Sequence, residues 1–292
     1  MALYHTHRPQ LFSTVVGQEH IVKTLLNQIR TNKVAHAYLF SGPRGIGKTT
    51  TARLVAKAVN CLNRKDTDIE PCNTCASCVA ITAGHALDVI EIDAASHTGV
   101  DHVREHIIDN AQFRPTSSRY KVFIIDEVHM LSTSAFNALL KTLEEPPKHV
   151  LFILATTEMD HLPDTIISRC QRFTFSKIPR ERLHDHLAAI AKIEGRTCDD
   201  AVLDQIVHKS EGSVRDAVSL LEQVLATGDT HITETSVAHI LPPSTKESTR
   251  RIVRALITKQ TQAALQEIAV LEQHGSIGTA MFDDIISFLR TV

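Results

Sequence analysis

The feature that most constrains this chain is a nine-residue string, Gly42-Pro43-Arg44-Gly45-Ile46-Gly47-Lys48-Thr49-Thr50. It follows an apolar run over 37–40 and precedes a helical pattern over 50–59. A strand, a GxxxxGK[ST] loop and a helix in this order are typical of a phosphate-binding loop. Its glycines let backbone N–H groups face the phosphates, Lys48 would reach the β- and γ-phosphates, and Thr49 would ligate Mg²⁺. The sequence therefore predicts a domain that binds a nucleoside triphosphate.

A second apolar run ends in two carboxylates. Residues 121–127 read KVFIIDE, so a buried strand would bring Asp126 and Glu127 to the carboxyl edge of a parallel sheet. Asp126 would hold Mg²⁺, directly or through water, and Glu127 would polarise the attacking water. Two adjacent acidic residues can also simply mark the solvent-exposed end of a strand, without a catalytic role. With a phosphate-binding loop in the same chain, we favour a hydrolase over a protein that only binds nucleotide.

Four of the six cysteines lie close together in the sequence: Cys61, Cys72, Cys75 and Cys78. Four thiolates can complete a tetrahedral Zn²⁺ shell with Zn–S bonds of about 2.3 Å, and a site without an open position would be structural. An iron–sulfur cluster is the alternative that the spacing leaves open, and His85 is the one substitute ligand to consider. We expect Cys170 and Cys198 to be small buried or half-buried residues.

Composition and pattern set the broad organisation. The 292 residues carry a formal net charge of −2, so any nucleic-acid surface would be local. No signal-peptide pattern and no run of 18 apolar residues is present, so we expect a cytoplasmic protein with no membrane partner. Strands and helices alternate to about residue 175, and only helices are expected after Pro179. We predict a doubly wound α/β domain over 1–178, a small all-helical domain over 179–242 and more helices over 243–292.

Several strings together resemble one protein family. They are GPRGIGKTTTARLVAKAVNC, CNTCASC, EIDAASHTGVDHVRE, VFIIDEVHMLSTSAFNALLKTLEEPP, LATTEMDHLPDTIISRC and EGSVRDAVSLLEQ. They are similar to the bacterial DNA polymerase III tau/gamma family, the motor subunits of the sliding-clamp loader, over essentially the whole chain. The resemblance implies an AAA+ core with a parallel sheet and an inserted zinc knuckle, a helical lid, and a helical collar domain over 243–292 that is incomplete.

The resemblance implies roles for three further residues. Thr157 matches the first sensor of the γ-phosphate, and Arg215 matches the second sensor, carried by the lid. Arg169, in Ser168-Arg169-Cys170, matches the arginine finger that acts on the nucleotide of a neighbouring subunit. Forked guanidinium donors suit the charge of a transferring phosphoryl group.

The resemblance also implies the cofactors, the activity and the partners. The cofactors would be ATP, Mg²⁺ and Zn²⁺, and the activity would be ATP hydrolysis that drives loading of the sliding clamp on primed DNA for replication. The partners would be the clamp, primer-template DNA, the delta and delta prime subunits and further tau/gamma copies, in a hetero-oligomer. The chain belongs by resemblance to a polymerase holoenzyme, yet no nucleotidyl-transfer site is visible in its sequence.

Two segments depart from the pattern of the family. Thr6-His7-Arg8-Pro9 lacks the aromatic residue that usually precedes Arg-Pro on the adenine side. The loop 95–100 has His97 and Gly99 where relatives tend to have basic residues. We therefore expect DNA phosphates to be held by helix N-terminal N–H groups and hydroxyls, at His97, Thr98, Ser132 and Thr133.

Two other functions remain open at this point. A helicase-type loader or a branch-migration AAA+ ATPase would share the phosphate-binding loop and the sensors. The cysteine cluster and the Ser-Arg-Cys motif favour a clamp loader over these. An ATP-binding scaffold without turnover is the other alternative, and the intact Lys48, Glu127 and Arg169 argue against it.

Overall fold

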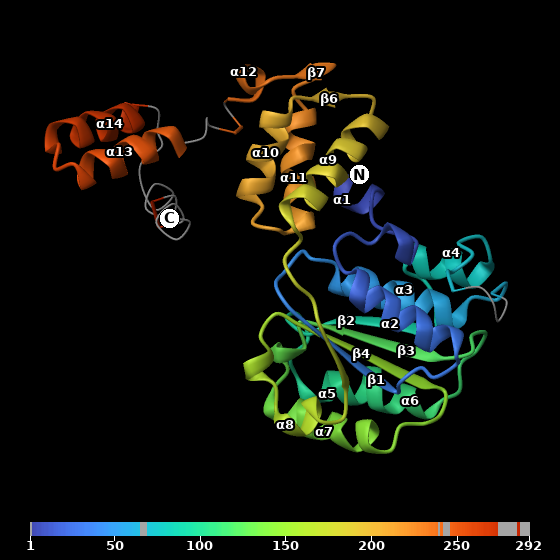
Figure 1. The fold of residues 1–292 in the computed structure, drawn as a ribbon. Helices are drawn as coiled ribbons and strands as arrows, with labels where there is room; N and C mark the ends of the chain where they lie inside the picture. Colours follow the sequence, from blue (N-terminus) through green and yellow to red (C-terminus); the bar gives the residue numbers. More distant parts are fainter. Residues whose placement is uncertain (1, 65–68, 239, 242–245, 274–284, 287–292) are drawn as a thin grey trace. The chain divides into compact units, whose positions relative to one another are not determined.

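The computed structural model describes residues 2–64, 69–238, 240–241, 246–273 and 285–286 (Figure 1). Two compact units divide the chain, one of residues 1–190 and 207–222 and the other of residues 191–206 and 223–292. The strands are β1 (Ala37–Ser41), β2 (Val89–Asp93), β3 (Lys121–Asp126), β4 (Val150–Thr156), β5 (Gln171–Thr174), β6 (Thr197–Cys198) and β7 (His231–Ile232).

The helices of the described residues are of three kinds. The α-helices are α1 (Leu3–Thr6), α2 (Glu19–Arg30), α3 (Lys48–Asn60), α4 (Ala76–Ala83), α5 (Val100–Val103), α6 (Asp109–Gln112), α7 (Thr133–Glu144), α8 (Asp164–Ile167), α9 (Arg180–Ile193), α10 (Asp200–Lys209), α11 (Val214–Leu225), α12 (Glu234–Val237), α13 (Lys246–Ile257) and α14 (Thr261–Gln273). Short 3₁₀ turns are η1 (Phe12–Thr14), η3 (Val128–Met130) and η4 (Met159–His161), and η2 (Arg104–Ile108) is a π-helical turn.

Five parallel strands form the sheet of the first unit, in the order β2-β3-β4-β1-β5. Every residue of β1 and of β4 is buried. Strands that are apolar along their whole length are typical of parallel sheets with helices on both faces. The predicted α/β fold with a parallel sheet is confirmed.

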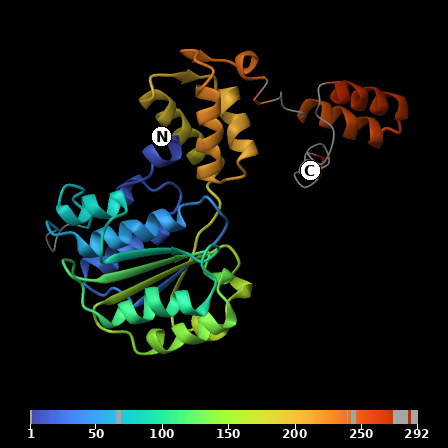
Figure 2. The same cartoon turned by 180° about the vertical axis from the view of Figure 1, so that it is seen from behind.

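Helices cover both faces of this sheet. α2 and α3 lie on one face, and α5, α6, α7 and α8 lie on the other (Figures 1 and 2). α2 buries Ile21, Leu25 and Ile29, which are four residues apart and share one side of the helix. Successive strand residues point to opposite faces, so Phe40 packs with the α2 and α3 side and Leu39 with the other. The sheet thus has a separate apolar layer on each face.

One helix of the first unit is interrupted. Residues 100–112 form one continuous helical stretch that is divided into α5, η2 and α6, because its middle turn is π-helical. The side-chain amide of Asn110 donates to the carbonyl oxygens of Glu105 (3.0 Å) and His106 (3.3 Å). A side-chain donor that competes for helix carbonyls accompanies the wider turn.

The second unit holds a feature that the sequence did not predict. β6 and β7 form a parallel pair, Thr197 with His231 and Cys198 with Ile232, so the expectation that only helices follow Pro179 was wrong in this detail. Strands of two residues are too short to show an alternating pattern. Further along, α13 and α14 pack through Ile252 and Ile268.

The boundaries at 178 and 242 stay predictions. The last part of the region expected to be helical over 243–292 lies largely outside the described residues. Within the described ranges, no helix is both long enough and apolar enough to cross a membrane.

Candidate nucleotide and metal sites

The phosphate-binding loop joins β1 to α3, and two of its glycines have backbones that other residues rarely adopt. Gly47 precedes α3 with a φ of +103°, and Gly45 has a φ of +73°. A Cβ at Gly45 would lie 2.1 Å from the hydroxyl oxygen of Ser213, so no side chain fits there. The loop therefore keeps its backbone N–H groups at the N-terminus of α3, where an anion is favoured.

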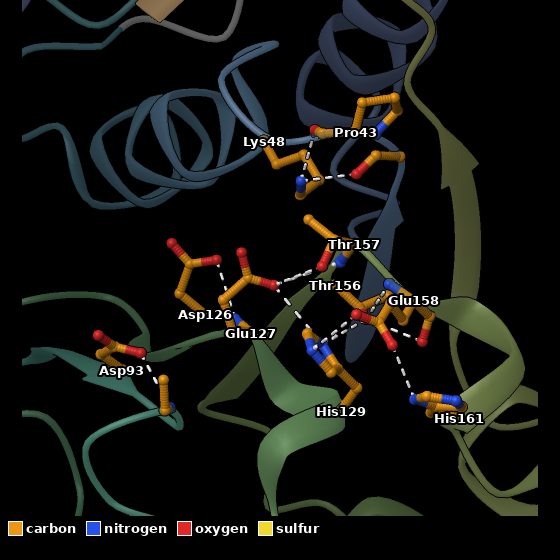
Figure 3. A network of polar contacts seen from close by, with 12 residues as sticks. Pro43, Lys48, Asp93, Asp126, Glu127, His129, Thr156, Thr157, Glu158 and His161 are labelled. Atoms are coloured by element: carbon orange, nitrogen blue, oxygen red, sulfur yellow. Dashed lines mark hydrogen bonds and ion pairs between the residues drawn. The ribbon is translucent and has the colours of Figure 1, made fainter. Parts of the chain in front are cut away.

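Lys48, the first residue of α3, is nearly buried, with 5% of its surface exposed. Its ammonium donates to the carbonyl oxygens of Gly42 (2.7 Å) and Pro43 (2.8 Å), as Figure 3 shows. Burial lowers the pKa of Lys48, while the charges of Glu127 and Asp126 act in the opposite direction. The two carbonyl oxygens hold the Lys48 ammonium at the loop, where phosphate oxygens can replace them as its hydrogen-bond acceptors.

Thr49 and Asp126 meet beside this lysine. The Thr49 hydroxyl donates to Asp126 Oδ2 at 2.6 Å, although the residues come from α3 and from the end of β3. Hydroxyl and carboxylate oxygens are the ligands that Mg²⁺ prefers. The two residues assigned to Mg²⁺ by sequence are thus brought together, and their oxygen atoms fit such an ion.

Glu127 follows β3 in the left-handed backbone region, with a φ of +46°. Its Oε2 accepts from the hydroxyl (3.0 Å) and the backbone N–H (3.3 Å) of Thr157 (Figure 3). A non-glycine residue in this region costs about 1–3 kcal/mol, and such strain clusters at functional sites. The strained turn aims the carboxylate at the end of β4, so Glu127 and Thr157 form one unit.

His129 completes a polar network that sequence reasoning missed. Its Nδ1 lies 3.0 Å from the Thr156 hydroxyl and 3.5 Å from Glu127 Oε2, and its Nε2 lies 3.8 Å from Glu158 Oε1. Glu158 also contacts His161 at 2.8 Å (Figure 3). The only sequence signal was the position of His129 two residues after the acidic pair.

The pocket over the loop has walls from distant parts of the sequence. Its lining residues are Tyr4, His7, Arg8, Pro9, Val15 and Val16 from the N-terminal segment, Arg44 to Thr50 from the loop and α3, Asp126 and Glu127, His186 from α9, and Val214, Arg215 and Val218 from α11. Gly42 and Pro43 contribute carbonyl oxygens to Lys48 instead. Thr157 and Arg169 are not among the lining residues.

Arg215 connects α11 to this pocket. Its backbone N–H donates to the Gly45 carbonyl oxygen at 3.1 Å, and its guanidinium lies 5.0 Å from the centre of the Tyr4 ring. Burial, followed by repulsion from Arg53, lowers the pKa of the nearby Arg8. Four cationic side chains, Arg8, Arg44, Lys48 and Arg215, therefore line the pocket, where they favour an anionic ligand.

Arg169 follows α8 and is held by a different acid. Its guanidinium pairs with the Glu144 carboxylate at the end of α7 and donates to the Thr165 carbonyl oxygen at 2.7 Å. Its side chain is about one-third exposed. The structure therefore places Arg169 outside the pocket formed by its own chain.

The four clustered cysteines converge between α3 and α4. All four sulfur atoms lie within 4.8 Å of one another, and the Cys72 and Cys78 sulfurs are 4.0 Å apart. Tetrahedral Zn–S bonds of about 2.3 Å place sulfurs about 3.8 Å apart. A hydrogen bond from Thr74 lowers the pKa of Cys72 to about 5. The set fits one divalent ion, whereas a cluster of several irons would hold its thiolates farther apart.

The four residues expected to contact DNA form two neighbouring turns. The Ser132 N–H donates to the Thr98 carbonyl oxygen at 3.1 Å, and the Ser132 hydroxyl caps α7, whose first residue is Thr133. His97 stacks on His102 with ring centres 4.0 Å apart. His97 and Thr98 precede α5, the first turn of the interrupted helix over 100–112, so each of the two turns leads into the N-terminus of a helix.

Comparisons with known proteins match both the α/β part and the helical part of this chain to DNA polymerase III subunits. A model of the family described as DNA polymerase III, delta subunit, matches residues 17–179, and a model of the ATPase lid domain of DNA polymerase III clamp loader subunits matches residues 182–230. The chain is 43% identical to DNA polymerase III subunit gamma of Buchnera aphidicola, over 97% of this chain and 77% of that one. The chain belongs to the DNA polymerase III tau/gamma family.

Other members of the tau/gamma family are longer. Identity is 48% with DNA polymerase III subunit tau of Bacillus subtilis, over 99% of this chain and 51% of the relative. The chain is 41% identical to DNA polymerase III subunit tau of Escherichia coli, over 98% of this chain and 44% of the relative. The chain spans about half the length of these relatives.

A solved structure shares the fold at lower identity. The RuvB Holliday junction branch migration motor of Thermotoga maritima superposes with a TM-score of 0.59 and 20% identity, over 86% of this chain and 79% of that one. This likeness shows a shared fold alone.

Proposed function

We propose that this chain is an ATP-driven motor subunit of a bacterial clamp loader, which places the sliding clamp on primer-template DNA. Membership of the tau/gamma family supports this function. The observation that carries it is the 2.6 Å contact between Thr49 and Asp126, in a pocket that also holds Lys48 and Arg215. A phosphate-binding loop, a carboxylate for Mg²⁺ and an arginine from another helix are the parts that ATP hydrolysis needs.

The residues of the pocket have separate roles in this proposal. The backbone N–H groups of residues 44–50 bind the phosphates, and Lys48 leaves its two carbonyl partners to pair with phosphate oxygens. Thr49 and Asp126 hold Mg²⁺, which when bound neutralises charge on the phosphates. Glu127 orients the attacking water and accepts its proton, Thr157 sets the direction of that carboxylate, and Arg215 contacts the phosphates from α11.

Arg169 acts in trans in this proposal. Its side chain pairs with Glu144 outside the pocket of its own chain, which leaves that pocket without a finger. The neighbour is a delta prime subunit or another tau/gamma copy, and delta completes the hetero-oligomer.

The cysteine cluster holds one structural Zn²⁺ and takes no part in the chemistry. The chain itself hydrolyses ATP and transfers no nucleotide to DNA.

Mixed assemblies test this function. An isolated chain binds ATP but hydrolyses it slowly, because the charge of the transition state lacks its finger. Lys48→Ala and Arg169→Ala chains are each inactive in the loader. Together they recover part of the activity, because the Lys48→Ala neighbour still donates Arg169 to an intact loop. Arg172→Ala, three residues away and also exposed, is the control and leaves hydrolysis unchanged. Full ATPase activity in a dilute monomer would contradict the proposal.

A further inference from the structure

Residues 2–16 form a segment that we call the N-terminal strap. It supplies six lining residues of the nucleotide pocket, between Tyr4 and Val16. At its start, the Leu3 N–H donates to Glu222 Oε2 at 3.2 Å, and the Tyr4 ring lies under the Arg215 guanidinium. The strap is therefore a wall of the pocket that meets α11 at one end.

The other end of the strap is held by the cysteine knuckle, which we define as residues 61–64 and 69–83. The carboxylate of Glu70 accepts from two backbone N–H groups of the strap, Phe12 at 2.7 Å and Ser13 at 2.8 Å. The Asn73 side-chain amide donates to the Gln10 carbonyl oxygen at 3.1 Å. Hydrogen bonds to a carboxylate are about twice as strong as neutral ones. The knuckle thus holds the backbone of the strap at residues 10–13.

A buried lysine reinforces this attachment. Lys57, on α3, is only 2% exposed, and its ammonium donates to Gln10 Oε1 at 2.8 Å. The Thr82 hydroxyl, on α4, donates to the same oxygen at 3.3 Å. Gln10 therefore links the strap both to the helix that follows the phosphate-binding loop and to the knuckle.

The strap has little structure of its own. Its two helical pieces are α1, of four residues, and η1, of three. Phe12 is the strap side chain most deeply buried in the core, at 1% exposure, and the two Glu70 contacts lie at Phe12 and the next residue. A segment without its own core is ordered by its contacts, and a ligand that needs it ordered binds less tightly when those contacts are lost.

We propose that the cysteine knuckle sets the nucleotide affinity of this chain by holding the N-terminal strap against the pocket, with Glu70 as the positioning residue. The inference rests on the proposed nucleotide site and adds a role for a module that the hydrolysis steps do not use. Glu70 lies two residues before Cys72, so a metal ion bound by the cysteines would help to fix its position.

The test is Glu70→Gln in the full chain, which keeps the shape of the side chain and all four cysteines. Titration with a fluorescent ATP analogue gives the dissociation constant, and hydrogen exchange reports on residues 2–16 and, separately, on residues 42–50. We expect about tenfold weaker binding and faster exchange in the strap, with unchanged exchange in the loop and an unchanged zinc content. Glu145→Gln, an exposed residue with the same change of charge, is the control and binds like the wild type.

The outcomes separate this inference from the proposed function. A wild-type chain that does not bind the analogue would overturn both. A wild-type chain that binds while Glu70→Gln has the same affinity would overturn the inference alone, whether or not the strap exchanges faster. Equal loss of affinity in Glu145→Gln would also overturn it, because the effect would then come from net charge.

Discussion

At the scale of single residues, Glu127 has a strained backbone conformation, and its carboxylate accepts a hydrogen bond from the Thr157 hydroxyl. Glu127 directly follows β3 and Thr157 directly follows β4, and both lie beside the polar network around His129. A carboxylate that must orient water needs a fixed direction more than it needs a particular pKa. The Thr157 hydroxyl supplies that direction.

Thr157→Val removes this hydroxyl and keeps the shape of the side chain. We expect the affinity for ATP to stay within about twofold and the rate of hydrolysis in the assembled loader to fall by about tenfold or more, because the carboxylate loses its main donor. Calorimetric titration and a phosphate-release assay measure the two quantities. Thr24→Val is the control, since its hydroxyl bonds only within α2, to the His20 carbonyl. A loss of affinity equal to the loss of rate would contradict this role.

Some residues of the site could be predicted from a local sequence motif, and others could not. Lys48, Thr49 and Asp126 could be predicted, because a motif of fixed spacing places the first two and a buried strand delivers the third. Tyr4 and His129 could not, because their roles arise from contacts across the fold. Tyr4 lies more than two hundred residues from Arg215 in sequence, and no local pattern encodes that contact.

At the scale of elements, the four cysteines of the knuckle form its proposed zinc site. Replacing Cys75 by Ser removes one of four ligands, so we expect loss of the bound zinc and a melting temperature lower by several degrees. Metal analysis and thermal unfolding measure these. Cys198→Ser, outside the cluster, is the control and leaves both unchanged. A Cys75→Ser chain without metal and with wild-type stability would show that the cluster has no structural role.

Three histidines on and before α5 and η2 form a stack. The His102 ring lies 4.0 Å from that of His97 and 4.1 Å from that of His106. Burial first, and then the charges of His106 and His97, lower the pKa of His102, against a smaller effect of Glu105. In the described part of the chain, His102 Nδ1 is buried without a hydrogen-bond partner. The fold thus favours the neutral form of this ring.

A lowered histidine pKa makes stability depend on pH in a known direction. The unfolded chain takes up a proton on His102 below about pH 6.5, while the folded chain resists it. The contribution of His102 to stability is therefore present above that pH and is lost as the pH falls toward the lowered pKa. Urea unfolding at pH 7.5 and 5.5 should show a smaller drop in midpoint for His102→Gln than for the wild type. His20→Gln, an exposed residue of α2, is the control. An equal drop in all three proteins would rule this out.

Elements were predicted well where the pattern was long. β3 was predicted from the apolar run over 121–127, and in the structure it ends one residue earlier, at Asp126. β6 and β7 were not predicted because two residues carry no period, and the π-helical turn was not predicted because no sequence pattern marks the hydrogen bonds of the Asn110 side chain that accompany it. Short elements stabilised by tertiary contacts leave little trace in sequence.

At the scale of the whole molecule, a net charge of −2 limits how DNA could be held. We expect the assembled loader to bind primer-template DNA with an affinity that falls steeply with salt and does not depend on base sequence, since hydroxyls and N–H groups near Ser132 and Thr133 contact phosphates. Titrations at several salt concentrations on two unrelated sequences measure this. Thr133→Val should weaken binding to both sequences equally, and Thr24→Val should not. A strong preference for one sequence would contradict the model.

The order of strands in the sheet has a consequence for how the protein is made. β1 leads directly into the phosphate-binding loop, yet its partners in the sheet are β4 and β5, the last two strands of the first unit to be synthesised. At typical rates of translation, the ribosome needs on the order of 10 s to pass from β1 to the end of β5. Until β4 has been made, neither edge of β1 can pair, so its apolar side chains are accessible to chaperones and to misfolding. The nucleotide pocket, whose lining residues extend to Val218, can therefore be completed only after that residue has left the ribosome.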